Sequence, residues 1–308
     1  MAIRVGLGLG LFLGSMALGW WLGRLGVLTE PKAARLVRVI VKGLSPLVLC
    51  FVFWQLPLRR PEPWLLPLVG LLVSSSTLIP AFLYARRALS RPQIGSFLTC
   101  AFFSNLGYLG AFTAFALYGE VAYGLCMLYL VFFTPCFYTV GFSIASRYGQ
   151  PRASSGLGSA YNDELRLYPF LGMLAGLALN LSKVPRPLVF EWLNHVLIPV
   201  DTALYLTAIG SQITVTSPRP WLRPCLVMSG IKFLYTPLVA WALVSLLRID
   251  GLARTVILLE AATPVAVSPL VLPLLFGLDR PLANALWLST TALAIPWIVA
   301  LLPLLTRL

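Results

Sequence analysis

The stretch "AFFSNLGYLGAF", residues 101–112, decides how this chain is interpreted, because it interrupts an apolar run long enough to cross a bilayer. Asn105 is costly in hydrocarbon, and Gly107 and Gly110 weaken a helix within the run. Ser104 and Asn105 can cap a helix that restarts there. The stretch therefore predicts a transmembrane helix that is broken near its centre.

The composition predicts an all-α membrane protein. Of the 308 residues, 59% are hydrophobic and 11% charged, and the mean hydropathy is +0.88. The formal charge of +13 is carried by basic residues in short loops, where they orient a membrane protein and contact anionic lipid. We therefore expect no nucleic-acid partner. The five cysteines lie within or beside apolar segments and predict neither a metal site nor a disulfide framework.

Ten transmembrane spans are predicted, the first being a retained helix rather than a signal peptide. They are Val5–Leu28, Ala34–Leu56, Trp64–Tyr84, Ile94–Leu117, Val121–Ser146, Leu167–Leu181, Val189–Ile213, Leu222–Leu247, Thr255–Phe276 and Pro281–Leu305. A linker rich in Ser and Gly, residues 148–166, separates residues 1–147 from residues 167–308, with five spans on each side.

The distribution of Lys and Arg predicts the orientation. These residues are more frequent in the loops after the odd-numbered spans, which include the central linker. The linker is therefore expected in the cytoplasm and both termini outside. Because each half has an odd number of spans, the two halves would be inverted repeats. Aligning Gly119 with Gly277 places Asn105 opposite Thr263 and Gly110 opposite Ser268.

The ninth span has its own interruption, "LLEAATPVAVSPLVLP", residues 258–273. Thr263-Pro264 is typical of a helix start, and Ser268 with Pro269 prevents a continuous helical ladder. Broken helices survive in a membrane only where they face protein or line a cavity. Two breaks at equivalent positions of inverted repeats would bring positive half-helix ends together at the midplane, where they favour an anionic solute. The alternative is that these small residues and prolines serve helix packing alone.

Three segments resemble the auxin efflux carrier family, which includes plant auxin exporters and bacterial malonate and malate permeases. They are "LGWWLGRLGVLTEPKAARLVRVIVKGLSPLVL" (residues 18–49), "SNLGYLGAFTAFALYGE" (residues 104–120) and "ATPVAVSPLVLPLLFGLDRPLANALWLSTT" (residues 262–291). Asn105, Gly110, Thr263 and Pro264 match the crossover positions of that family. One departure is that the family often has a proline after the glycine that corresponds to Gly110, where this chain has alanine.

The resemblance implies the ten-helix fold shared with bile-acid:sodium symporters, in which helices four and nine break and cross. It implies a core domain of spans three to five and eight to ten. This core would move, in the manner of an elevator, against a panel domain of spans one, two, six and seven. It also implies a homodimer formed through the panel.

Ionisable residues within the spans are functional hypotheses. Ser104, Asn105 and Glu260 resemble the sodium ligands of the bile-acid symporters, which would make Glu260 a Na⁺ ligand or a proton carrier. The alternative is a glutamate in the outer interface, because Glu260 is near the start of its span.

Asp201 lies near the middle of span seven, and Lys42 and Lys232 are candidate partners for its charge. A static pair or a water-facing aspartate is the simpler interpretation. Lys42 either steers an anion or snorkels to the cytoplasmic face. His195 is expected to be an ordinary helix residue rather than a proton carrier.

No enzyme is expected, because the chain has a single histidine and no nucleophile elbow. Walker and Rossmann glycine patterns are also missing from the sequence, which argues against ATP-driven pumping. The prediction is a secondary transporter of small carboxylates with no cofactor beyond a coupling Na⁺ or H⁺. A sodium-coupled symporter of the bile-acid type, a non-transporting ligand-sensing receptor and a channel are the alternatives. The excess of Arg over Lys points to a GC-rich bacterial genome, and the expected location is the bacterial inner membrane.

Overall fold

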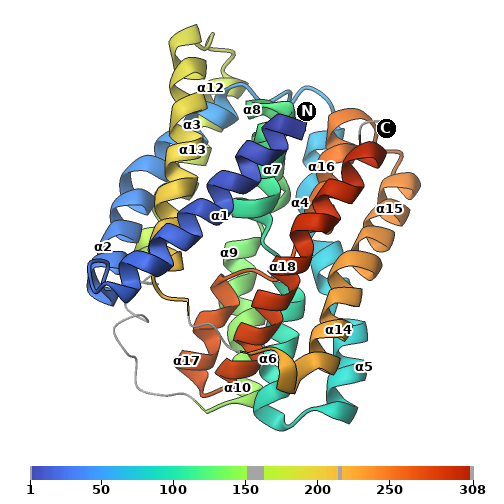
Figure 1. The fold of residues 1–308 in the computed structure, drawn as a ribbon. Helices are drawn as coiled ribbons and strands as arrows, with labels where there is room; N and C mark the ends of the chain where they lie inside the picture. Colours follow the sequence, from blue (N-terminus) through green and yellow to red (C-terminus); the bar gives the residue numbers. More distant parts are fainter. Residues whose placement is uncertain (1, 151–162, 214–216, 306–308) are drawn as a thin grey trace. The chain divides into compact units, whose positions relative to one another are not determined.

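The computed structural model describes residues 2–150, 163–213 and 217–305 (Figure 1). Over these residues the chain is helical and, apart from an isolated β-bridge, contains no paired strands. In the first sequence half the helices are α1 (Ala2–Arg24), α2 (Glu30–Val39), η1 (Ile40–Leu44), α3 (Ser45–Trp54), α4 (Glu62–Ser76), α5 (Leu78–Ala88), α6 (Arg91–Phe102), η2 (Leu106–Gly110), α7 (Ala111–Tyr118), α8 (Glu120–Tyr129), α9 (Phe133–Cys136), η3 (Phe137–Gly141) and α10 (Phe142–Tyr148). In the second half they are α12 (Asp163–Leu181), α13 (Leu188–Gly210), η4 (Arg219–Trp221), α14 (Leu222–Gly230), η5 (Ile231–Tyr235), α15 (Thr236–Leu246), α16 (Gly251–Ala261), η6 (Ser268–Val271), α17 (Leu272–Phe276) and α18 (Arg280–Leu305).

Within the described residues, four helical segments are long and apolar enough to cross a membrane: Glu30–Trp54, Glu62–Ala88, Glu120–Tyr148 and Arg219–Leu246. Large apolar side chains on other helices are also exposed, for example Trp192 of α13, at 78%. A soluble protein rarely leaves such side chains in water, whereas lipid solvates them. The predicted all-α membrane class is therefore confirmed, while the count of ten spans and their inverted repetition stay predictions.

The described chain forms two compact units, each assembled from both sequence halves. Unit 1 comprises Met1–Arg60, Ala111–Met127 and Gly156–Ile213, and unit 2 comprises Pro61–Gly110, Leu128–Ser155 and Thr214–Leu308, in each case as far as the residues are described. The chain between Ala111 and Met127, which is the second half of predicted span four and the start of span five, belongs to unit 1. Which parts of the chain move relative to one another stays a prediction.

Close helix packing in unit 1 depends on glycine pairs spaced four residues apart. A Cβ atom at Gly172 or Gly176 of α12 would collide with the backbone of α3 at Pro46 or Cys50. Gly19 of α1 similarly faces the backbone of α13, where an added Cβ atom would overlap the carbonyl of Thr207. Small residues at such spacings let membrane helices approach at backbone distance, where dispersion contacts and not the hydrophobic effect hold them together.

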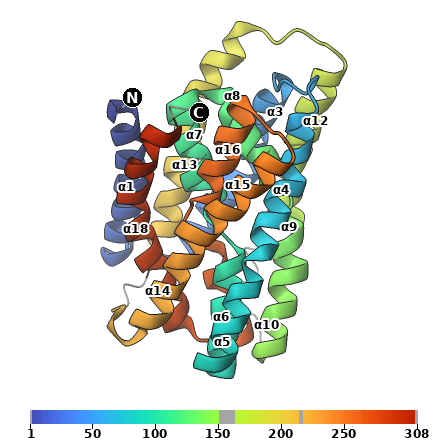
Figure 2. The same cartoon turned by 90° about the vertical axis from the view of Figure 1, so that its right-hand side faces the viewer.

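In unit 2, α15 packs against α4 and α16, while α18 packs against α6 and α14 (Figure 2). The helical run Arg219–Leu246 is continuous, but it contains the wide π turn η5 just before Thr236-Pro237. Pro237 has no N–H to donate, so the regular ladder cannot close there, and π turns of this kind often mark functional positions. The hydroxyl of Thr236 compensates by donating to the carbonyls of Ile231 and Lys232.

Candidate functional site

The helices of predicted spans four and nine are both interrupted, and both interruptions belong to unit 2. Helix α6 ends at Phe102, and Phe103 has the extended dihedral angles φ −94° and ψ 112°. Helix α16 ends at Ala261, shortly before Thr263-Pro264. The residue before a proline is disfavoured in the helical region, which explains why the chain leaves the helix there.

The two extended segments cross and pair with each other. Ser104 and Val265 form an antiparallel β-bridge. The N–H of Asn105 donates to the carbonyl of Pro264 at 2.7 Å, and the N–H of Ala266 donates to the carbonyl of Phe103 at 3.0 Å. Each break thus satisfies backbone groups that the other leaves without helical partners, which a membrane interior requires.

The structure corrects the expected roles of Thr263-Pro264 and Ser268. Thr263 does not cap a new helix; its hydroxyl donates to the carbonyl of Glu260 and closes the end of α16. The helix restarts at Ser268, with Pro269 in its first turn, because a proline there has no N–H to lose. The carbonyl of Pro264 is instead used in the pairing with Asn105.

A buried lysine lies at the end of α6. The Nζ atom of Lys232 donates to the carbonyl of Ala101 at 2.6 Å and to the hydroxyl of Ser104 at 2.7 Å. The hydroxyl of Thr77 donates to the same Ala101 carbonyl at 2.9 Å. A cation at this position opposes the partial negative charge at the C-terminal end of the half-helix.

A fully buried carboxylate lies beside η2, the segment that follows the first break. Glu260 has no exposed surface, and a Cβ atom built on Gly110 would lie 2.7 Å from its Cδ and 2.8 Å from its Oε1. Gly110 is therefore a glycine because the Glu260 side chain occupies the space that a larger residue would need. At Gly107, by contrast, an added Cβ atom would make only an ordinary van der Waals contact, with Leu130 Cδ2 at 3.8 Å.

Asn105 lies directly before the helical segment Leu106–Tyr118, where a side chain usually accepts hydrogen bonds from the helix N-terminus. It is 3% exposed, and its Nδ2 atom is buried with no hydrogen-bond partner. The amide thus adds an unused donor to the N–H groups at a helix start. Unused donors at a positive helix end favour an anionic acceptor.

The proposed sodium ligands are only partly accounted for by this geometry. Ser104 already accepts a hydrogen bond from Lys232, while Asn105 and Glu260 flank the two breaks. No cluster of three or more His, Cys, Asp or Glu side chains arranged for a metal occurs in the described part of the chain. The sodium set stays a prediction.

The pairing of Asp201 with Lys42 or Lys232 stays a prediction, and within unit 1 the structure gives Asp201 a serine partner. Asp201, 5% exposed, instead accepts a hydrogen bond from Ser45 Oγ at 2.7 Å. Lys42 is exposed one turn before Ser45, and its Nζ lies 5.4 Å from the ring centroid of Tyr168. The Ser45 hydroxyl thus gives the Asp201 carboxylate a hydrogen-bond donor, and no lysine side chain has to be buried for this.

His195 lies on α13 with its ring centroid 5.5 Å from that of Phe115. Together with Glu191 and Trp192 it lines a pocket of about 290 Å³. His195 is exposed on this helix and belongs to unit 1. The expectation that it is an ordinary helix residue stays a prediction.

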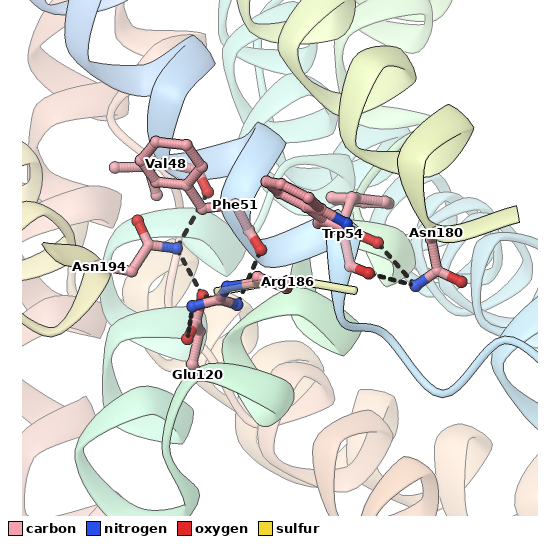
Figure 3. Close-up of polar contacts among 8 residues, drawn as sticks. Val48, Phe51, Trp54, Glu120, Asn180, Arg186 and Asn194 are labelled. Atoms are coloured by element: carbon pink, nitrogen blue, oxygen red, sulfur yellow. Dashed lines mark hydrogen bonds and ion pairs between the residues drawn. The ribbon is translucent and has the colours of Figure 1, made fainter. Parts of the chain in front are cut away.

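A second buried polar cluster, in unit 1, was missed by the sequence analysis (Figure 3). The guanidinium of Arg186 donates to both carboxylate oxygens of Glu120, at 2.9 and 3.0 Å, and to the carbonyl of Phe51 at 2.9 Å. Asn194 Nδ2 also donates to Glu120 and to the carbonyl of Val48. The side chains of Arg186 and Glu120 are 7% and 3% exposed.

One feature of the sequence could have indicated this cluster: Glu120 and Arg186 both lie directly beside apolar runs. Glu120 opens α8 directly after a turn glycine, and Arg186 stands between two prolines before α13. Arg186 lies in a loop, where a basic residue is expected to set orientation, and its partner Glu120 is 66 residues away in sequence. The cluster ties α8, α3 and α13 of unit 1 together.

Comparison with known proteins finds two distant relatives, and no protein-family profile matches the chain. A protein of Methanothermobacter thermautotrophicus is 25% identical over 284 residues, covering 90% of this chain and 91% of the relative. A protein of Methanocaldococcus jannaschii is 25% identical over 208 residues, covering 65% of each. Both bear the name uncharacterized transporter. The chain is thus similar, over nearly its whole length, to an archaeal protein named as a transporter.

Proposed function

We propose that this protein is a secondary transporter that carries small organic anions, carboxylates in the first place, across a membrane. The two relatives named as transporters and the membrane-spanning helices support a transport role. The observation that carries the proposal is the antiparallel crossing of two broken helices at Ser104 and Val265. Irregular backbone inside a membrane is expected where a solute or an ion is handled.

The charge and hydrogen-bonding character of the crossing favours an anion. Lys232 supplies a buried ammonium, and Asn105 supplies an amide donor without a partner. The start of the helical segment Leu106–Tyr118 adds the partial positive charge of a helix N-terminus. A carboxylate accepts hydrogen bonds without donating any, so it suits such a set of donors.

The proposed mechanism is alternating access, with one set of helices moving against another in the manner of an elevator and the two sequence halves as inverted repeats. One structural detail supports the alignment of the halves. Gly119 and Gly277, which the alignment superposes, both follow the helical segment after a break and have φ angles of 80° and 63°. This left-handed conformation favours glycine at both positions. The coupling ion, the bacterial inner membrane, the cytoplasmic linker and the panel homodimer belong to the same proposal.

Uptake by proteoliposomes tests the proposal. Purified protein is reconstituted, and the entry of radiolabelled acetate, malonate and malate is measured under an inward Na⁺ gradient, an inward proton gradient and neither. We expect saturable uptake of at least one carboxylate. The absence of protein-dependent flux for all of them under all three conditions would contradict the proposal.

Substitution of Asn105 tests where the anion binds. Asn105→Asp places a carboxylate beside the helix start, so we expect it to abolish carboxylate uptake through charge repulsion. Asn105→Ala removes only the donor, and a loss of roughly tenfold in apparent affinity is expected from one hydrogen bond to a charged group. Equal uptake by wild-type protein and Asn105→Asp would place the solute elsewhere.

A further inference from the structure

We propose that the ammonium group of Lys232 is a built-in monovalent cation. It occupies the position at the crossing where a free sodium ion would otherwise be bound, so that the protein needs no Na⁺ to form its site. The part of this inference that concerns flux rests on the transport function proposed above, whereas the part that concerns the folded site does not.

The ammonium is bound by the kinds of oxygen that bind hard cations. Its two acceptors are the backbone carbonyl of Ala101 and the hydroxyl of Ser104, at 2.6 and 2.7 Å. Carbonyl and hydroxyl oxygens are ligands of alkali and alkaline-earth ions in proteins, and the short distances are typical of charge-assisted hydrogen bonds. The Ala101 carbonyl lies in the last turn of α6, where the helix carries partial negative charge.

Local structure brings the lysine to this position. Lys232 lies in the π turn η5, which the following Thr236-Pro237 imposes, and it is fully buried. Neither ion pair found among the described residues, Arg186–Glu120 or Arg254–Asp250, includes Lys232. A buried charge requires compensation, and here it comes from the carbonyl at the end of α6 and from the hydroxyl of Ser104.

This arrangement competes with the sodium site suggested by family resemblance. Ser104 would be one of the sodium ligands, but its hydroxyl already accepts a hydrogen bond from Lys232. A sodium ion on the same oxygen would lie beside a positive ammonium group, and the two charges repel strongly in a medium of low dielectric constant. The ammonium and a bound sodium ion are therefore mutually exclusive at Ser104.

Removing the ammonium should create a site for a free cation. Lys232→Ala deletes the charge and the stem, leaving the oxygens of Ala101 and Ser104 beside a space that was filled. The thermal unfolding midpoint of the full chain in detergent is measured in choline, sodium, potassium and methylammonium chloride at equal ionic strength. Wild-type protein should have the same midpoint in all four salts. Lys232→Ala should have a lower midpoint in choline, which sodium or methylammonium raises.

Two further variants keep the test decisive. Lys42→Ala is the matched control, because Lys42 also lies in a π turn before a Ser-Pro pair but is exposed, so its midpoint should equal that of wild-type protein in every salt. Lys232→Met removes the charge and fills the space, so its lower midpoint should not respond to cations. This second variant remains informative if Lys232→Ala does not fold.

Flux measurements separate this inference from the proposed function. Carboxylate uptake by wild-type protein should be equal in sodium and choline, and Lys232→Met should lower it at least about tenfold. A wild-type midpoint or uptake rate that rises with Na⁺ would overturn the inference and leave the transport function intact. A midpoint of Lys232→Ala or Lys232→Met in choline equal to that of wild-type protein would also overturn it. If the midpoints depend on salt as expected but no variant and no wild-type protein shows carboxylate flux, the built-in cation is supported and the transport function is contradicted.

Discussion

Gly110→Ala is expected to abolish carboxylate uptake and to lower the stability of the folded protein. The added methyl group would lie closer to the Glu260 carboxylate than any van der Waals contact allows. Because Glu260 is fully buried, its side chain can give way only by moving against the packed groups around it. Overpacking of this kind costs about 1–3 kcal/mol, and here it also displaces the charged group next to the crossing.

Gly107→Ala is the matched control for this prediction, since Gly107 lies three residues earlier in the same η2 segment. Its added Cβ would have its nearest neighbour at an ordinary contact distance of 3.8 Å. Alanine also favours a helix over glycine, so stability should be unchanged or slightly higher. Uptake rates and thermal midpoints of the two variants provide the comparison. Equal uptake rates and thermal midpoints for Gly110→Ala and Gly107→Ala would contradict the close approach of Glu260 to Gly110.

Glu120→Gln is expected to destabilise the protein by about 3–5 kcal/mol, because it leaves the guanidinium of Arg186 buried without its counter-charge. The pair is bidentate and almost fully buried, unlike most surface ion pairs. The measurement is the free energy of unfolding of the detergent-solubilised protein, obtained from its denaturation at increasing denaturant concentration. Combining Glu120→Gln with Arg186→Met should recover part of the loss, because no unpaired charge then remains.

The control is the exposed ion pair between Arg254 and Asp250, whose N–O distance is 3.7 Å and whose aspartate side chain is 83% exposed. Asp250→Asn should change stability by less than about 1 kcal/mol, since water and salt screen such a pair. A comparable loss in Asp250→Asn and Glu120→Gln would contradict the assignment of Glu120 and Arg186 as a buried structural pair.

The positions of both breaks could be predicted from the sequence because they depend on local chemistry. Asn105 with its neighbouring glycines, and the residue pair Thr263-Pro264, disfavour a continuous helix whatever surrounds them. The restart at Ser268 was not predicted, since it depends on the use of the Pro264 carbonyl by a distant segment. Local propensity shows where a helix stops, whereas tertiary hydrogen bonds decide where it begins again.

The partners of the buried charges could not be predicted for a related reason. Lys232 is 128 residues from Ser104, and Arg186 is 66 residues from Glu120. Their pairing follows from how the helices pack, and no spacing within one helix encodes it. The sequence offered Lys42 and Lys232 as candidate partners of Asp201, and it did not indicate the hydrogen bond from Ser45, which lies one turn beyond Lys42.

Disulfide cross-linking of Ser104→Cys with Val265→Cys tests the crossing of the two broken helices most directly. The hydrogen bonds from Asn105 to Pro264 and from Ala266 to Phe103 flank this pair, which makes it a closely spaced antiparallel pair with Cα atoms roughly 4.5 Å apart. That separation suits a disulfide. With the five native cysteines replaced by alanine, mild oxidation should join the two positions, as peptide mass spectrometry can detect, and reduction should reverse it. Failure to cross-link, or equal cross-linking of Ser104→Cys with Val271→Cys, would contradict the crossing.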